Sequence, residues 1–200
     1  MTSSATVFLV RHGRTPLNAA GALRGRIDTP LDAVGRREAR LLAGVFDGGS
    51  LAAVVSSRLT RAVETAAEAA RLPVDVDDDL ADRDYWRWAA RRKRTRSPSS
   101  GRSRTCRAST RWTRSRRASP ARSPAPRTVA ASGAVVVVAR DAVNRQLLAS
   151  LVPSLGPAPG IAQRTACWNE LQRDGDEWSA PVVDAGPADG RRPQPRGRQR

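Results

Sequence analysis

Hydrophobic residues along this chain occur as short apolar runs that alternate with longer stretches of helical periodicity. The runs are short and valine-rich, as buried strands are, and they lie at residues 6–10, 53–56, 73–76 and 134–139. The helical stretches lie at residues 32–46, 59–71 and 141–151. Strands that alternate with helices are typical of parallel sheets, because a crossover helix returns the chain to the start of the next strand. The pattern therefore predicts an α/β fold: a three-layer α/β/α sandwich with a mostly parallel sheet.

The C-terminal part of the chain has the pattern of a closing hairpin. Residues 169–173 and 177–184 are separated by Asp174-Gly175, a dipeptide that favours a tight turn. Beyond Gly186 the chain consists mainly of Gly, Pro, Arg and Gln, which cannot bury a core. We therefore expect one domain over residues 1–185, with Asp32 as the N-cap of its first long helix, and a disordered tail over 186–200.

The single histidine of the chain, His12, closely follows the apolar run at 6–10. Gly13 lets the backbone turn sharply and lets an anion approach. Arg11 offers a planar set of donors that suits phosphate. A histidine in this place is either a reactive group on a rigid strand or a partly buried structural residue.

A second polar segment follows the run at 53–56. Ser56 or Ser57 is expected to cap the next helix, and Arg58 and Arg61 lie three residues apart near its start. A helix N-terminus beside an arginine attracts anions, because the helix dipole and the guanidinium are both positive there. This segment therefore predicts a second part of an anion site.

Three motifs in this order together resemble the histidine phosphatase superfamily, also called the phosphoglycerate mutase-like family. They are R-H-G-x-T-x-x-N from Arg11 to Asn18, R-G-x-x-D-x-P-L from Arg24 to Leu31, and the segment 54–66 with its two arginines. The resemblance extends through about residue 88 and implies a phosphoglycerate mutase-like fold. It also implies metal-independent hydrolysis of a small phosphate monoester, with no cofactor.

The resemblance assigns roles to individual residues. His12 takes the phosphoryl group as a phosphohistidine, and Arg11, Arg61 and Asn18 hold the phosphate oxygens. Asp82, in the segment L-A-D-R-D-Y, is the general acid, although a solvated acidic turn is the alternative because five other aspartates crowd it. Arg140 stands after the run at 134–139, where the family has its second histidine. It is expected to contact the phosphate but to impair activity, because arginine is longer and is always charged.

Residues 91–128 depart most strongly from the family pattern. They contain 14 Lys or Arg and no Asp or Glu, whereas the whole chain has 35 basic and 19 acidic residues and a net charge of +16. Such a segment is expected to be disordered. When residues 93–126 are back-translated with GC-rich codons and read in the adjacent frame, one result is a charge-balanced sequence that ends in a helical pattern. We therefore interpret the block as the product of a frameshift followed by a compensating shift near residues 126–132.

Three functional readings stay open at this point. The first is a phosphatase with a small phosphorylated substrate, the second is a catalytically dead family member, and the third is nonspecific nucleic-acid binding through residues 91–128. Trp112 is the single aromatic residue of that block, so stacking on bases gives little support to nucleic-acid binding. The sequence has no 18-residue apolar run, no signal-peptide pattern and two cysteines, so we expect a cytoplasmic protein with no membrane partner.

Overall fold

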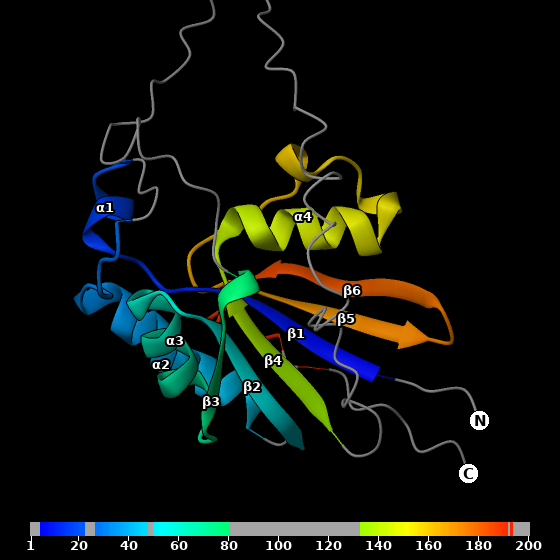
Figure 1. Cartoon of the computed structure of the whole chain (residues 1–200), viewed down its shortest axis with the longest axis horizontal. Helices are drawn as coiled ribbons and strands as arrows, with labels where there is room; N and C mark the ends of the chain where they lie inside the picture. Colours follow the sequence, from blue (N-terminus) through cyan, green and yellow to red (C-terminus); the bar gives the residue numbers. More distant parts are fainter. Residues whose placement is uncertain (1–4, 23–26, 48–49, 81–132, 192, 194–200) are drawn as a thin grey trace, which may run out of the picture.

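The computed structural model describes residues 5–22, 27–47, 50–80, 133–191 and 193. A six-stranded sheet with the order β3-β2-β4-β1-β5-β6 forms its centre (Figure 1). Its strands are β1 (Ala5–Arg11), β2 (Leu51–Ser57), β3 (Val74–Asp77), β4 (Ala134–Ala139), β5 (Trp168–Asp174) and β6 (Glu177–Ala185).

The strand that precedes His12, β1, lies inside the sheet between β4 and β5. It runs parallel to β4, with Val10 beside Val138, and antiparallel to β5, with Val10 opposite Trp168. β2 is parallel to both β3 and β4, and β6 is antiparallel to β5. Among the described strands only β5 therefore opposes β1. The sheet is mostly parallel, as predicted, and the carboxyl ends of β1, β2 and β4 lie along one edge.

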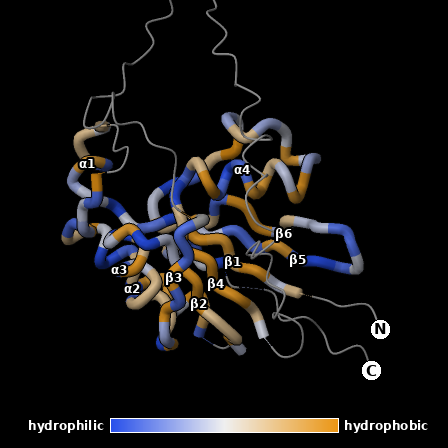
Figure 2. Tube along the Cα trace, viewed as in Figure 1, coloured by the Kyte–Doolittle hydropathy of each residue, from blue (hydrophilic) through white to orange (hydrophobic). Residues whose placement is uncertain are grey.

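Helices cover both faces of this sheet. They are α1 (Pro16–Ala19), α2 (Ala33–Phe46), α3 (Thr60–Ala69) and α4 (Asp141–Leu151). α2 and α3 lie on one face and α4 on the other (Figure 1). Alternate β1 residues serve the two sides: Phe8 packs with the α2 and α3 side, whereas Leu9 packs with Leu148 of α4. Figure 2 shows the central strands as the most hydrophobic part of the fold. The predicted three-layer architecture is confirmed.

The predicted elements agree with the structure to within a few residues. The helix expected over 59–71 begins at Thr60 and ends at Ala69. The hairpin turns one residue later than expected, at Gly175 and Asp176, where Gly175 has a φ of +59°. The short helix α1 was not predicted, because four residues are too few to show a helical period. The segment after β6 differs from the expected tail, since Asp189 accepts hydrogen bonds from the Gly186 amide and from Arg164.

Several expectations fall outside the described residues. These are Asp82, the basic block at 91–128 and its frameshift interpretation, the motif residues Arg24 and Gly25, and the end of the tail. Within the described part of the chain, no helix has the length and hydropathy needed to cross a membrane.

Candidate phosphate-binding site

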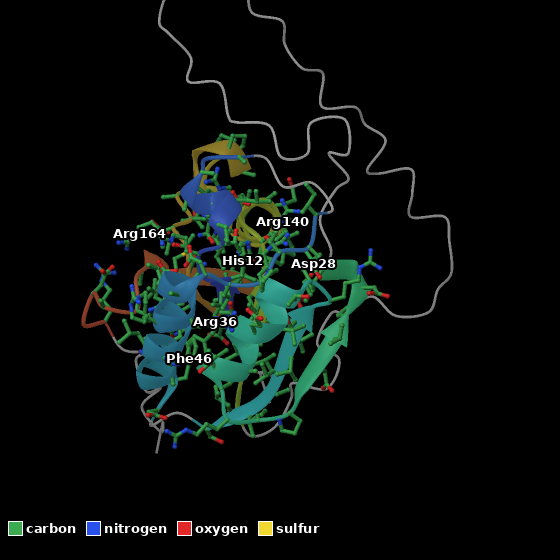
Figure 3. All side chains as sticks on the ribbon, turned by 90° about the vertical axis from the view of Figure 1, so that its left-hand side faces the viewer. His12, Asp28, Arg36, Phe46, Arg140 and Arg164 are labelled. Carbon is green, nitrogen blue, oxygen red and sulfur yellow. The ribbon has the colours of Figure 1, made fainter. Side chains whose placement is uncertain are left out.

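His12 lies at the carboxyl edge of the sheet, one residue beyond β1. Its amide donates to the carbonyl of Ala139 at 3.1 Å, and its own carbonyl accepts from the Ala166 amide at 3.1 Å. The first contact places His12 next to the end of β4, where Arg140 follows. His12 and Arg140 therefore share one end of the molecule (Figure 3). Both side chains are buried.

The imidazole of His12 is oriented by the chain that follows it. His12 Nδ1 lies 2.7 Å from the carbonyl oxygen of Gly13, which can only accept, so Nδ1 carries the proton. In the neutral ring this hydrogen bond places the lone pair on Nε2. The contact therefore selects the tautomer that a nucleophilic Nε2 requires.

Gly13 is required here because helix α2 approaches the backbone closely. A Cβ on Gly13 would lie 2.6 Å from the Gly35 oxygen, and a Cβ on Gly35 would lie 2.0 Å from the Arg14 oxygen. Asp32 caps α2, as predicted, by accepting from the Gly35 amide at 2.8 Å. The two glycines thus let the loop after His12 rest directly on the first turn of α2.

Helix α3 brings Arg61 to the same loop. The Gly13 amide donates to Thr65 Oγ1 at 3.0 Å, and this hydroxyl donates to the Arg61 carbonyl at 2.7 Å. The Arg61 side chain is fully buried; its Nη1 donates to the Ile27 carbonyl at 3.1 Å and lies 3.6 Å from Asp28 Oδ1. The loop that carries His12 and the start of α3 are therefore held together.

The expected serine cap of α3 is wrong. Asp28, from a distant loop, accepts from the Thr60 amide at 2.9 Å and from Thr60 Oγ1 at 2.7 Å. Ser56 Oγ instead donates to the Ser57 carbonyl, and Ser57 Oγ only reaches the Leu59 amide at 3.5 Å. The carboxylate therefore stabilises the N-terminus of α3 beside Arg61.

The remaining predicted residues enter from three elements. Arg11 ends β1, is buried, and its Nη1 donates to the main-chain carbonyl of Gln163. Arg140 precedes α4 and accepts from the Asn144 amide at 2.9 Å through its carbonyl. Asn18 closes a capping box on α1, with its Oδ1 accepting from the amide and hydroxyl of Thr15.

The structure brings three buried arginines to the sheet edge that carries His12. They are Arg11, Arg61 and Arg140. Among the described ion pairs, Asp28 pairs with Arg61. Buried guanidinium groups around one imidazole suit a phosphate ester, because charge-assisted hydrogen bonds to its oxygens are strong. The described residues contain no group of three or more His, Cys, Asp or Glu placed to hold a metal ion.

Sequence reasoning missed two contributors to this edge. Asp28 belongs to the motif R-G-x-x-D-x-P-L, but nothing in the sequence indicates its contact with α3. Gln163 contributes a main-chain carbonyl, which no pattern of side chains can indicate.

Comparisons with known proteins identify the family of this chain. The profile of the histidine phosphatase superfamily (branch 1) matches residues 7–184. "Bifunctional protein Rv2228c" of Mycobacterium tuberculosis is 44% identical over 86 residues, which are 41% of this chain and 24% of that protein. "Probable phosphoglycerate mutase GpmB" of Yersinia enterocolitica is 40% identical over 79 residues, 38% of this chain and 37% of that protein. The chain thus spans about a quarter and just over a third of these two relatives.

A solved structure shares the architecture over nearly the whole chain. The mycobacterial glucosyl-3-phosphoglycerate phosphatase Rv2419c, in complex with VO3, superimposes with a TM-score of 0.66 and 25% identity. The match covers 91% of this chain and 100% of that protein.

Proposed function

Because the chain belongs to the histidine phosphatase superfamily, branch 1, we propose that it hydrolyses a small phosphate monoester through a phosphohistidine at His12. One observation carries the proposal. The Nδ1 group of His12 is held by the Gly13 carbonyl, which directs the reactive lone pair to Nε2 at an edge lined by buried arginines. The name of the Rv2419c phosphatase supports hydrolysis. The name of the GpmB relative, a probable phosphoglycerate mutase, supports the alternative, which is phosphoryl transfer within the substrate.

In the first chemical step, His12 Nε2 attacks the phosphorus atom in line with the ester oxygen. The N–P bond forms as the P–O bond breaks, and the leaving oxygen takes a proton from a general acid. Arg11 and Arg61 stabilise the negative charge that spreads over the three remaining oxygens. Asp82 is our candidate for the acid, on the family resemblance.

In the second step, water attacks the phosphohistidine and restores His12. The carboxylate that has given up its proton takes one from this water, so inorganic phosphate leaves and the acid is ready again. Covalent catalysis of this kind replaces one difficult displacement by two easier ones.

Arg140 favours a second candidate, a family member that binds phosphate but turns over slowly or not at all. Its buried guanidinium stands where the family has a histidine that donates to the transferring group. Loss of one preorganised donor costs about 10²- to 10³-fold in rate. A longer, permanently charged group also holds a phosphate more strongly in the ground state.

Hydrolysis of an aryl phosphate by the purified chain, compared with His12→Ala, tests the proposal. We expect hydrolysis that vanadate inhibits and that His12→Ala abolishes. Arg58→Ala is the control, because Arg58 lies two residues before α3, is exposed and pairs with Asp78 at 3.8 Å. Equal background rates in all three proteins, with vanadate still bound, would replace the proposal by the catalytically dead alternative.

A further inference from the structure

Three buried amide side chains form a cluster beneath the carboxyl edge of the sheet. Gln163 Oε1 accepts from Asn144 Nδ2 at 3.3 Å and from Asn169 Nδ2 at 3.2 Å, and Gln163 Nε2 donates to Asn169 Oδ1 at 2.7 Å. All three side chains are at least 96% buried, since none exposes more than 4% of its surface. These three hydrogen bonds fix the cluster in place, while Asn144 Oδ1 is buried and has no hydrogen-bond partner in the described part of the chain.

The cluster joins the elements that carry the site. Asn169 Nδ2 also donates to the carbonyl of Leu9 in β1 at 2.8 Å, two residues before Arg11. Asn144 belongs to the first turn of α4, and its amide donates to the carbonyl of Arg140 at 2.9 Å. Gln163 is therefore held from β1, β5 and α4 at once.

The main chain of Gln163 is the part that reaches the site, because its carbonyl accepts from Arg11 Nη1. A guanidinium is rigid and planar, so a hydrogen bond that holds one Nη restricts the directions of its other donors. Arg11 Nε is buried and has no hydrogen-bond partner within the described part of the chain. It is thus a donor held ready beside the nucleophile.

We propose that Gln163 is the positioning residue of Arg11: its side-chain amide, locked between Asn144 and Asn169, places the carbonyl that aims the Arg11 guanidinium at the phosphoryl group. The inference rests on the proposed phosphate site and deepens it. It does not depend on turnover, because orientation of Arg11 affects the binding of any phosphate-like anion.

Gln163→Met tests the role, because methionine keeps the length of the side chain but loses both amide contacts. Gln172→Met is the matched control: Gln172 Nε2 donates to buried Glu170 at 2.7 Å, away from Arg11. Both variants lose side-chain amide hydrogen bonds, which are buried at Gln163 and part-buried at Gln172, so both are expected to lower the melting temperature. Calorimetric titration with vanadate then separates a site effect from a general loss of stability.

We expect Gln163→Met to weaken vanadate binding about tenfold, as small misplacements of binding groups do, and Gln172→Met to leave it unchanged. In an Arg11→Lys background, Gln163→Met should cause no further loss, because its effect passes through Arg11. Unchanged affinity in Gln163→Met, or an equal loss in both backgrounds, would overturn the proposal.

A second measurement keeps this result separate from the fate of the proposed function. The ¹⁵N–¹H signal of Arg11 Nε, assigned by its absence in Arg11→Lys, reports the order of the guanidinium without any ligand. If the wild-type chain binds no vanadate, the phosphatase proposal fails. If the Arg11 Nε signal shifts or broadens in Gln163→Met but not in Gln172→Met, positioning by Gln163 is still supported. Identical signals in the wild type, Gln163→Met and Gln172→Met would refute it.

Discussion

Arg140 follows β4 as His12 follows β1, and the hydrogen bond between His12 and Ala139 makes the two residues neighbours across that pair of strands. Their chemistry differs in one respect that affects turnover. An imidazole donates a hydrogen bond and remains neutral or charged according to its surroundings, whereas a guanidinium is always charged. In the proposed mechanism, Arg140 would bind the phosphate oxygens of substrate, intermediate and product alike, which would lower the ground state together with the transition state.

Arg140→His is expected to raise kcat for aryl phosphate hydrolysis by about 100-fold, the effect of one well-placed donor. Arg145→His is the control: it is the same substitution, five residues later and within α4, and it should leave kcat unchanged. Initial rates at saturating substrate measure both. A variant no faster than wild type would show that Arg140 already serves the transition state as well as histidine does.

The identity of Gly35 follows from its close packing against the loop after His12. Gly35→Ala should destabilise the fold by about 1–3 kcal/mol, because its Cβ would meet the backbone oxygen of Arg14 at 2.0 Å, and backbone yields less than a side chain. Gly44→Ala lies in the same helix with open space around it and should stabilise by about 0.5–1 kcal/mol. Urea unfolding measures both, and equal effects in the two variants would contradict this account of the close approach.

Aspartates stabilise the N-termini of α2 and α3, but only one of these two contacts can be predicted from adjacent residues. Asp32 lies directly before α2, so the sequence predicted it. Asp28 caps α3 from 32 residues away, and no local pattern reveals such a contact. Helices and strands were thus predictable where the hydrophobic residues show a clear periodicity or where the capping residue is adjacent in the sequence. The contacts that join elements, such as Thr65 to Gly13 and Gln163 to Arg11, depend on the tertiary fold.

Asp32 also gives α2 a dependence on pH. Partial burial acts to raise the pKa of Asp32, but hydrogen bonds from the Gly35 amide and from Arg14 outweigh it and hold the pKa below its usual value. Because the folded pKa is below the unfolded one of about 3.9, the ionised cap stabilises the fold above that pH. The stabilisation is lost as pH falls through the folded pKa.

Asp32→Asn keeps a cap acceptor but cannot titrate there. Between about pH 5 and pH 3, the free energy of unfolding should therefore fall more steeply in the wild-type chain than in the variant. Chemical unfolding at several pH values measures the two slopes, and parallel curves would show that the cap does not contribute to acid sensitivity.

At the scale of the whole molecule, the alternation of apolar runs and helical stretches was sufficient to predict the layers, the parallel core and the closing hairpin. His12 and Arg140 were found for the same reason, because parallel strands place their carboxyl ends along one edge. Asp82 and the basic block lie outside the described residues, so their roles stay predictions.

The basic block predicts binding to nucleic acid that is governed by charge. Because it holds 14 basic residues and one tryptophan, affinity should fall steeply with salt and should not depend on base sequence. Fluorescence anisotropy with two unrelated oligonucleotides at about 50 and 200 mM salt measures this. Vanadate should not compete with the oligonucleotides, since His12, Arg11 and Arg61 lie outside residues 91–128 in the sequence. A preference for one oligonucleotide would point to an evolved binding role instead.

The central place of β1 has a consequence for synthesis on the ribosome. Both neighbours of β1 come late in the chain, since Val7 pairs with Val135 and with Leu171. A nascent chain of 80 residues therefore contains β1 and His12 but neither strand that pairs with β1, and a strand with two open edges is a hazard for aggregation. β1 becomes protected only when the ribosome has translated beyond β4 and β5, so the strand that precedes His12 is among the last parts of the sheet to be completed.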